Sequence, residues 1–130
     1  MKKYYVSPTF TYDDDDMIDI LSSATYDIGY WGSVDDGANE WWEARDEMPK
    51  GSTYEDLMYH ILKKGQYIFI SDAESDPEDE EYWELNLDML LKGIKLTIEN
   101  GYWSGKMDDI DGQVGDIIFQ YALFDEIVFG

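Results

Sequence analysis

Acidic residues run through this 130-residue chain in long stretches that contain no Lys or Arg. Ten acids lie between Lys3 and Arg45, nine between Lys64 and Lys92, and six after Lys106. The formal net charge is -21, whereas a magnitude of about 2 to 8 suffices to keep a small domain in solution. Any fold of this chain must therefore keep most of its carboxylates at the surface and tolerate their mutual repulsion.

The chain nevertheless holds enough apolar residues to fold. Hydrophobic residues make up 44% of it and aromatic residues 16%, and burying them offsets the entropy lost on ordering. We expect one α+β domain over residues 1–130, with a small antiparallel sheet of about four strands and about four helices. The strands are expected at residues 3–12, 26–34, 41–44 and 66–71, with 26–34 and 41–44 forming a hairpin.

Polar residues that cap helix N-termini predict where the helices begin. These are Asp13 or Asp14, Ser52 in a capping box with Glu55, Asn86, and Asp111. Gly93 and Gly115 lie in the last two of these predicted helices. Because a glycine lets two helices approach closely, we expect the last two helices to pack on each other at these positions.

The last two helical segments resemble a known group of sequences. The stretches WELNLDMLLKGIKLTIENG and DIIFQYALFDEIVFG, with ATYDIGYW near residue 30, are similar to a family of small proteins found in bacteriophages and prophages. Asp125 and Phe129 stand where that family usually has glycine and tyrosine. The resemblance covers a third to a half of the chain. It implies a phage origin and no particular activity.

The residue types that build most catalytic and metal sites are scarce. The chain has no Cys and a single His, His60, so thiolate sites are excluded and zinc or His-based catalysis is disfavoured. Acids in residues 72–81 follow calcium-loop spacing, yet Pro77 stands where that loop needs Gly and Trp83 where it needs Glu. Among thirty acids, a pair of carboxylates is no evidence of acid–base catalysis. We therefore expect a protein that is not an enzyme and that has no cofactor and no metal.

The charge also limits the partners. Nucleic acids and anionic membrane surfaces attract Lys and Arg, so we expect neither to bind this chain. No run approaches the roughly 18 apolar residues that a membrane span needs. The predicted location is the cytoplasm of the bacterial host cell. The expected partner is a basic host protein that itself binds nucleic acid.

Two acidic runs are the candidate binding surfaces. Residues 72–81 read DAESDPEDEE and are followed by Tyr82-Trp83, and residues 13–16 read DDDD. A folded array of carboxylates can substitute for the phosphates of DNA, so the sequence suggests a DNA mimic that inhibits a host defence protein or regulator. The residues predicted to contact the partner are Asp13, Asp14, Asp15, Asp16, Asp76, Glu78, Asp79, Glu80, Glu81 and Trp83.

Other readings of the same residues remain open. The run at 13–16 can serve only to cap a helix, and the excess charge can serve only solubility. The paired aromatic residues can belong to the core rather than to a surface that binds cations. The chain can also be a small-molecule binder that uses residues Tyr26 to Trp42, or a structural or assembly protein of a phage particle.

Overall fold

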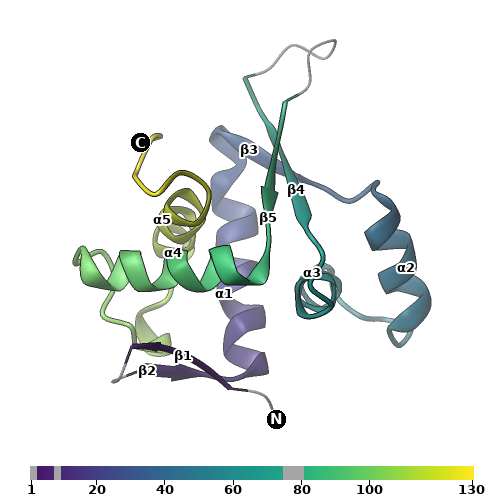
Figure 1. Ribbon diagram of the computed structural model, residues 1–130, viewed down its shortest axis with the longest axis horizontal. Coiled ribbons are helices and arrows are strands. Elements are labelled where there is room, and N and C mark those ends of the chain that lie inside the picture. The colour runs from purple at the N-terminus through teal and green to yellow at the C-terminus, as the bar shows by residue number, and fades with distance from the viewer. Residues whose placement is uncertain (1–2, 8–9, 75–80) are drawn as a thin grey trace.

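The structure is a computed structural model that describes residues 3–7, 10–74 and 81–130. Within them the fold is mixed α/β, with five α-helices and two small antiparallel sheets (Figure 1). The elements in chain order are β1 (Tyr4–Ser7), β2 (Phe10–Tyr12), α1 (Asp14–Asp27), the 3-10 turn η1 (Ile28–Tyr30), β3 (Gly32–Asp35), α2 (Asn39–Glu47), α3 (Tyr54–Lys63), β4 (Ile68–Asp72), β5 (Tyr82–Leu85), α4 (Leu87–Glu99), the 3-10 turn η2 (Met107–Asp109) and α5 (Gly112–Phe124).

The strands divide between two sheets instead of forming one. β1 and β2 make a two-stranded sheet, and β3, β4 and β5 make a three-stranded sheet with β4 in the middle. The sequence correctly predicts β4 as a buried central strand, because Ile68 and Ile70 are fully buried. The C-terminal end of β4 and the N-terminal end of β5 extend beyond the helices (Figure 1).

The hairpin expected over residues 26–34 and 41–44 is wrong. The first segment contains the end of α1, η1 and the start of β3, and the second lies inside α2. Trp41 and Ala44 are the buried residues of α2, and a spacing of three places them on one face of a helix. Tryptophan favours strands, but here the burial of one helical face outweighs the strand preference of the Trp41-Trp42 pair.

The helix caps agree with the sequence at three of the four helices for which they were predicted. Asp13, Asn86 and Asp111 each accept a hydrogen bond from the backbone N–H three residues later. The capping box of α3 is formed by Thr53 with Asp56, one residue beyond the predicted pair Ser52 and Glu55. α2, for which no cap was predicted, has no side-chain cap.

α5 packs between α4 on one side and α1 on the other, and a glycine marks each contact. A Cβ on Gly93 of α4 would overlap the carbonyl oxygen of Ile118 and lie 2.8 Å from the Cβ of Ala122. A Cβ on Gly115 of α5 would lie 2.7 Å from the Cα of Ala24 in α1. The predicted packing of the last two helices is confirmed at Gly93, whereas Gly115 serves the contact with α1.

One hydrophobic cluster joins all five α-helices and both sheets. Its largest fully buried side chains include Trp31, Trp41, Tyr12 and Phe119. Among the described residues, no helix has both the length and the apolar character needed to cross a membrane.

Substituting Gly93 with Ala should destabilise the fold. The added methyl group meets backbone atoms of α5, which cannot move without shifting the helix, so we expect a loss of about 2 kcal/mol or more in the free energy of unfolding. Urea denaturation measures this loss. Gly29→Ala is the matched control, because a Cβ at Gly29 meets no atom within 4 Å. Equal stability of the two variants would contradict the close contact between α4 and α5.

Candidate acidic partner-binding site

The run Asp13 to Asp16 serves the start of α1. The side chain of Asp13 accepts from the backbone N–H of Asp16 at 2.9 Å, and the side chain of Asp16 accepts from that of Asp13 at 3.1 Å. Burial, followed by the nearby charge of Asp13, raises the pKa of Asp16 above its ordinary value. Two of the four predicted binding residues are thus committed to a reciprocal cap.

Asp14 is also tied to the fold, whereas Asp15 is exposed. The carboxylate of Asp14 accepts a hydrogen bond from the hydroxyl of Tyr59, whose oxygen lies 2.9 Å from the hydroxyl of Tyr4. This chain of contacts connects α1, α3 and β1. Burial and the hydrogen bond to Asp14 raise the pKa of Tyr59. The geometry therefore favours the capping and packing interpretation of this run, and Asp15 alone faces solvent freely.

The second acidic run leads to the three-stranded sheet. Asp76, Glu78, Asp79 and Glu80 lie outside the described residues, in the segment that connects β4 to β5. Glu81 is exposed at the end of this connection, directly before β5, and its carbonyl accepts a hydrogen bond from the backbone N–H of Asp72 at 3.0 Å. The described ends of β4 and β5 are therefore still paired where the acidic segment begins.

Trp83 lies on the inner face of the sheet rather than among the carboxylates. Its ring packs against Trp31, Phe124 and Phe129, with centroids 5.0 to 6.3 Å apart. Because neighbouring residues of a strand point to opposite faces, Tyr82 and Glu84 belong to the outer face. The aromatic residue that accompanies the acids is thus Tyr82, which is 43% exposed.

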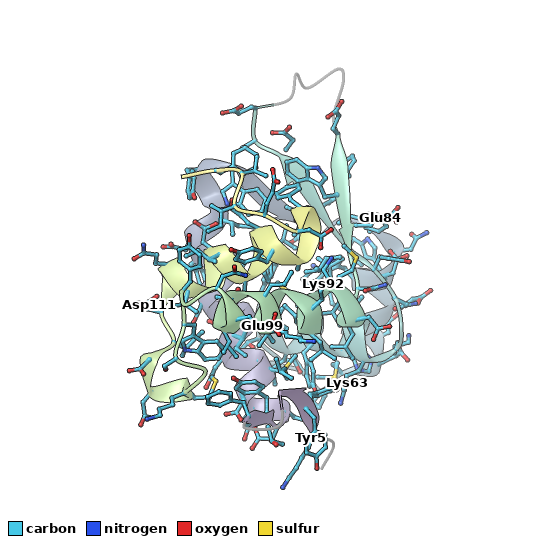
Figure 2. The ribbon with its side chains drawn as sticks, turned by 60° about the vertical axis from the view of Figure 1, so that its left-hand side comes forward. Tyr5, Lys63, Glu84, Lys92, Glu99 and Asp111 are labelled. Carbon is cyan, nitrogen blue, oxygen red and sulfur yellow. The ribbon has the colours of Figure 1, made fainter. Side chains whose placement is uncertain are left out.

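Strand register places further acids and rings on this outer face. Asp35 of β3 lies opposite Phe69 of β4, which lies opposite Glu84 of β5. Adjacent strands are about 4.8 Å apart, so the backbone positions of Asp35 and Glu84 are about 10 Å apart, with Phe69 between them. Tyr82 completes a hollow of about 390 Å³ with these three residues. We call Asp35, Phe69, Tyr82 and Glu84 the outer sheet face; Figure 2 labels Glu84.

The outer sheet face is chemically suited to a cation. Among the described residues, no Lys, Arg or His forms an ion pair with Asp35 or Glu84. A guanidinium group can lie over an aromatic ring and bond to carboxylates beside it. In the same part of the chain, no three acidic or His side chains are grouped to hold a metal ion. The arrangement therefore fits an organic cation or the basic side chain of a partner.

Sequence reasoning missed Asp35, Phe69 and Glu84. The alternation of Tyr82, Trp83, Glu84 and Leu85 signals which residues of β5 face outward. Only the pairing register brings Asp35 and Phe69 beside them.

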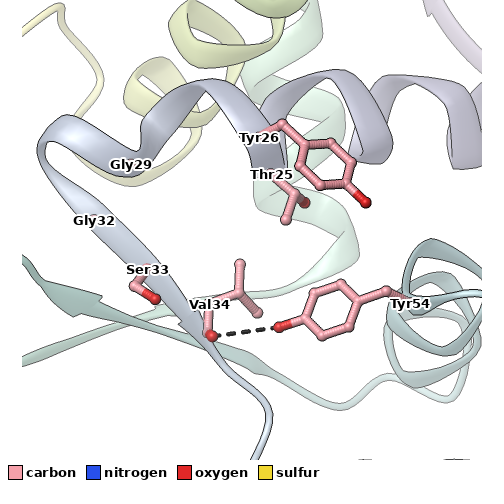
Figure 3. Close-up of a pocket in the computed structure, with 7 residues that line it drawn as sticks. All are labelled: Thr25, Tyr26, Gly29, Gly32, Ser33, Val34 and Tyr54. Atoms are coloured by element: carbon pink, nitrogen blue, oxygen red, sulfur yellow. Dashed lines mark hydrogen bonds between the residues drawn. The ribbon is translucent and has the colours of Figure 1, made fainter.

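A separate cavity of about 500 Å³ lies within the region from Tyr26 to Trp42. It is lined by Thr25, Tyr26, Gly29, Gly32, Ser33, Val34 and Tyr54 (Figure 3). The Tyr54 hydroxyl donates a hydrogen bond of 3.3 Å to the carbonyl of Val34. Trp31 and Trp41, by contrast, are fully buried in the core. The walls of this cavity are thus tyrosines and small residues.

Ionisation of Tyr54 should lower the free energy of unfolding at alkaline pH. Burial, with the charges of Asp36 and Asp35, raises its pKa from 10.0 to about 12. Between these values the unfolded chain releases a proton that the folded chain keeps, so the free energy of unfolding should fall as pH rises from 10 to 12. The Tyr54→Phe variant should lose about 1 kcal/mol at neutral pH, through the lost hydrogen bond, and fall less steeply above pH 10. Urea denaturation at each pH tests this; an unchanged slope in the variant would contradict it.

Comparisons of the chain with protein-family models, with curated proteins and with solved structures find no significant match. The resemblance of the C-terminal segment to phage proteins therefore stays a prediction. The case for a function rests on the geometry and charge of the described residues.

Proposed function

We propose that this protein is a non-enzymatic, phage-encoded binding protein that occupies the nucleic-acid site of a basic host protein. The observation that carries the proposal is the outer sheet face, where Asp35 and Glu84 lie beside the rings of Phe69 and Tyr82, and where no basic side chain among the described residues lines the hollow. The acidic segment from Asp72 to Glu81 continues from the same strands. The whole surface offers carboxylates to a cationic partner.

The segment between β4 and β5 is rich in negative charge along the sequence. DAESDPEDEE has seven acids in ten residues and no Lys or Arg. A groove that binds DNA does so through Lys and Arg, and the same basic side chains are attracted to carboxylates. We infer that such a groove on the partner takes up this segment in place of DNA.

The chain itself shows how such a surface holds a guanidinium group. Arg45 lies 3.7 Å from the carboxylate of Asp36, and its guanidinium carbon stands 5.0 Å from the centroid of the Trp42 ring. The outer sheet face combines the same two elements, a carboxylate and an aromatic ring, without an internal Arg to fill them. We propose that an Arg of the partner takes this place.

Capture from the bacterial host identifies the partner, and binding measured against salt tests the mechanism. The affinity should fall steeply as salt rises, and duplex DNA should compete with the protein for the partner. A partner that is indifferent to DNA would contradict the mimic proposal.

Charge-neutral variants locate the surface. We expect the pair Asp35→Asn with Glu84→Gln, and separately Glu81→Gln with changes in the adjoining acids, to weaken binding by about tenfold or more. The control pair Asp19→Asn with Asp46→Asn removes the same charge from exposed positions on α1 and α2. If the control pair weakens binding as much as the others, the outer sheet face has no special role.

The cavity of Figure 3 supports a second candidate function, binding of a small molecule. The cavity has room for a side chain at Gly29, because a Cβ there meets no atom within 4 Å. Gly29→Leu should therefore fill the cavity without disturbing the fold. If this variant abolishes binding of a small molecule retained by the purified protein, and leaves capture of the basic partner unchanged, the cavity is a separate ligand site. If a retained molecule stays bound in the variant, this candidate fails.

A further inference from the structure

A carboxylate lies buried within α5. Asp116 is only 6% exposed. It accepts hydrogen bonds from the Tyr30 hydroxyl at 2.6 Å, from the Trp31 indole N–H at 2.7 Å and from the Gln120 amide at 3.0 Å. All three donors are neutral, so they orient the carboxylate through hydrogen bonds and bring no positive charge to it.

A buried charge without a counter-ion is costly. Among the described residues, no Lys, Arg or His forms an ion pair with Asp116. The nearby charge of Asp27 has the same sign and, after the larger effects of burial and of Asp116 itself, helps raise the pKa of Tyr30 to about 12. The carboxylate of Asp116 is therefore held by hydrogen bonds, with no ion pair to it among the described residues.

Asp116 lines a cavity of about 410 Å³ whose walls are mostly rings and aliphatic groups. Tyr30, Tyr102, Ile117 and Phe129 are among its lining residues. Tyr30 and Tyr102 are half exposed, so the cavity is open to solvent between them. A carboxylate at the base of aromatic walls is an arrangement that binds organic ammonium groups.

Gln120 holds the wall of this cavity in place. Its side-chain oxygen accepts from the backbone N–H groups of Val128 and Phe129, both at 2.8 Å, and its amide donates to the carbonyl of Phe129 at 3.1 Å. The Phe129 ring then stacks on Trp31, with centroids 5.2 Å apart and planes within 3°. The cavity is thus built by specific contacts between segments far apart in the sequence.

A second cavity, of about 370 Å³, shares Tyr102 and Ile117 with the first and adds Asp109 and Asp111. Asp111 caps α5 and Asp116 follows five residues later, so their positions are separated by about 7.5 Å along the helix. Figure 2 labels Asp111 at the beginning of α5. We call the two adjoining cavities the α5 groove. Asp116 lines one cavity, Asp109 and Asp111 line the other, and Tyr102, Gln113 and Ile117 line both.

We propose that the α5 groove binds an aliphatic polyamine. One ammonium group pairs with Asp116 between the rings of Tyr30 and Tyr102, and a second lies near Asp109 and Asp111. Five residues also turn Asp116 about 140° around the helix from Asp111, so a ligand that reaches both ends needs ammonium groups joined by a long, flexible chain of methylenes. The intervening methylenes lie over Ile117 and Tyr102. A hydrated metal ion would leave these apolar walls unused, so the groove favours an organic cation.

Isothermal titration of the full chain with spermidine, at physiological salt, tests the proposal. Salt at this level screens the diffuse attraction of polyamines to an acidic protein. We expect saturable binding of one spermidine, with butylamine and Nα-acetyl-lysine amide at least tenfold weaker because each offers one ammonium group. Magnesium should not displace spermidine. Equal affinity for the single-ammonium probes would overturn the proposal, and would instead indicate a site for a lysine side chain.

Two variants and one control assign the binding to the groove. Asp116→Asn should weaken spermidine by tenfold or more, and Tyr102→Ala should weaken it without touching the hydrogen bonds of Asp116. Asp46→Asn removes one charge from an exposed position on α2 and should change the affinity less than twofold. If Asp116→Asn fails to fold, Tyr102→Ala decides the question. Unchanged binding in Tyr102→Ala, or an equal loss in Asp46→Asn, would overturn the proposal.

Discussion

Repulsion among carboxylates is the constraint under which this structure forms. Several of the acids offset it by accepting hydrogen bonds within the fold. Asp13, Asp16 and Asp111 accept backbone hydrogen bonds at helix N-termini, where the helix dipole favours negative charge. Asp14 receives the hydroxyl of Tyr59. These contacts use four of the carboxylates to cap α1 and α5 and to join α1 to α3, while the apolar cluster supplies the main driving force.

Features that depend on neighbouring residues were predictable, and those that depend on distant ones were not. Capping residues and a short apolar run locate α4, α5 and β4 because each signal is complete within one segment. The helix α2 was not predicted, because its two buried residues are too few to show a helical apolar face in the sequence. They form such a face only against the core of the folded protein. Gly115 was likewise recognised as a point of close approach, but the sequence could not say that α1, rather than α4, would meet it.

The candidate sites divide in the same way. The acidic segment before Tyr82 is visible in the sequence, yet the outer sheet face exists only through the register that sets Asp35 beside Phe69. The α5 groove has no sequence signal at all. Its central carboxylate, Asp116, is one acid among thirty, and its partners Tyr30 and Trp31 lie 86 and 85 residues away. Asp116 is buried without an ion pair among the described residues. Burial is a property of the folded state, so the sequence alone does not reveal it.

The contacts of Asp116 also constrain the order of events during synthesis. A ribosome releases α1, η1 and β3 well before α5, so Trp31 leaves the exit tunnel long before the carboxylate and the Phe129 ring that will enclose it. Closing so long a loop carries an entropic cost that local contacts do not repay. The indole of Trp31 therefore lacks these partners until the ribosome has synthesised α5 and Phe129. The high negative charge of the chain then has a protective role, because nascent chains that repel one another are slow to aggregate.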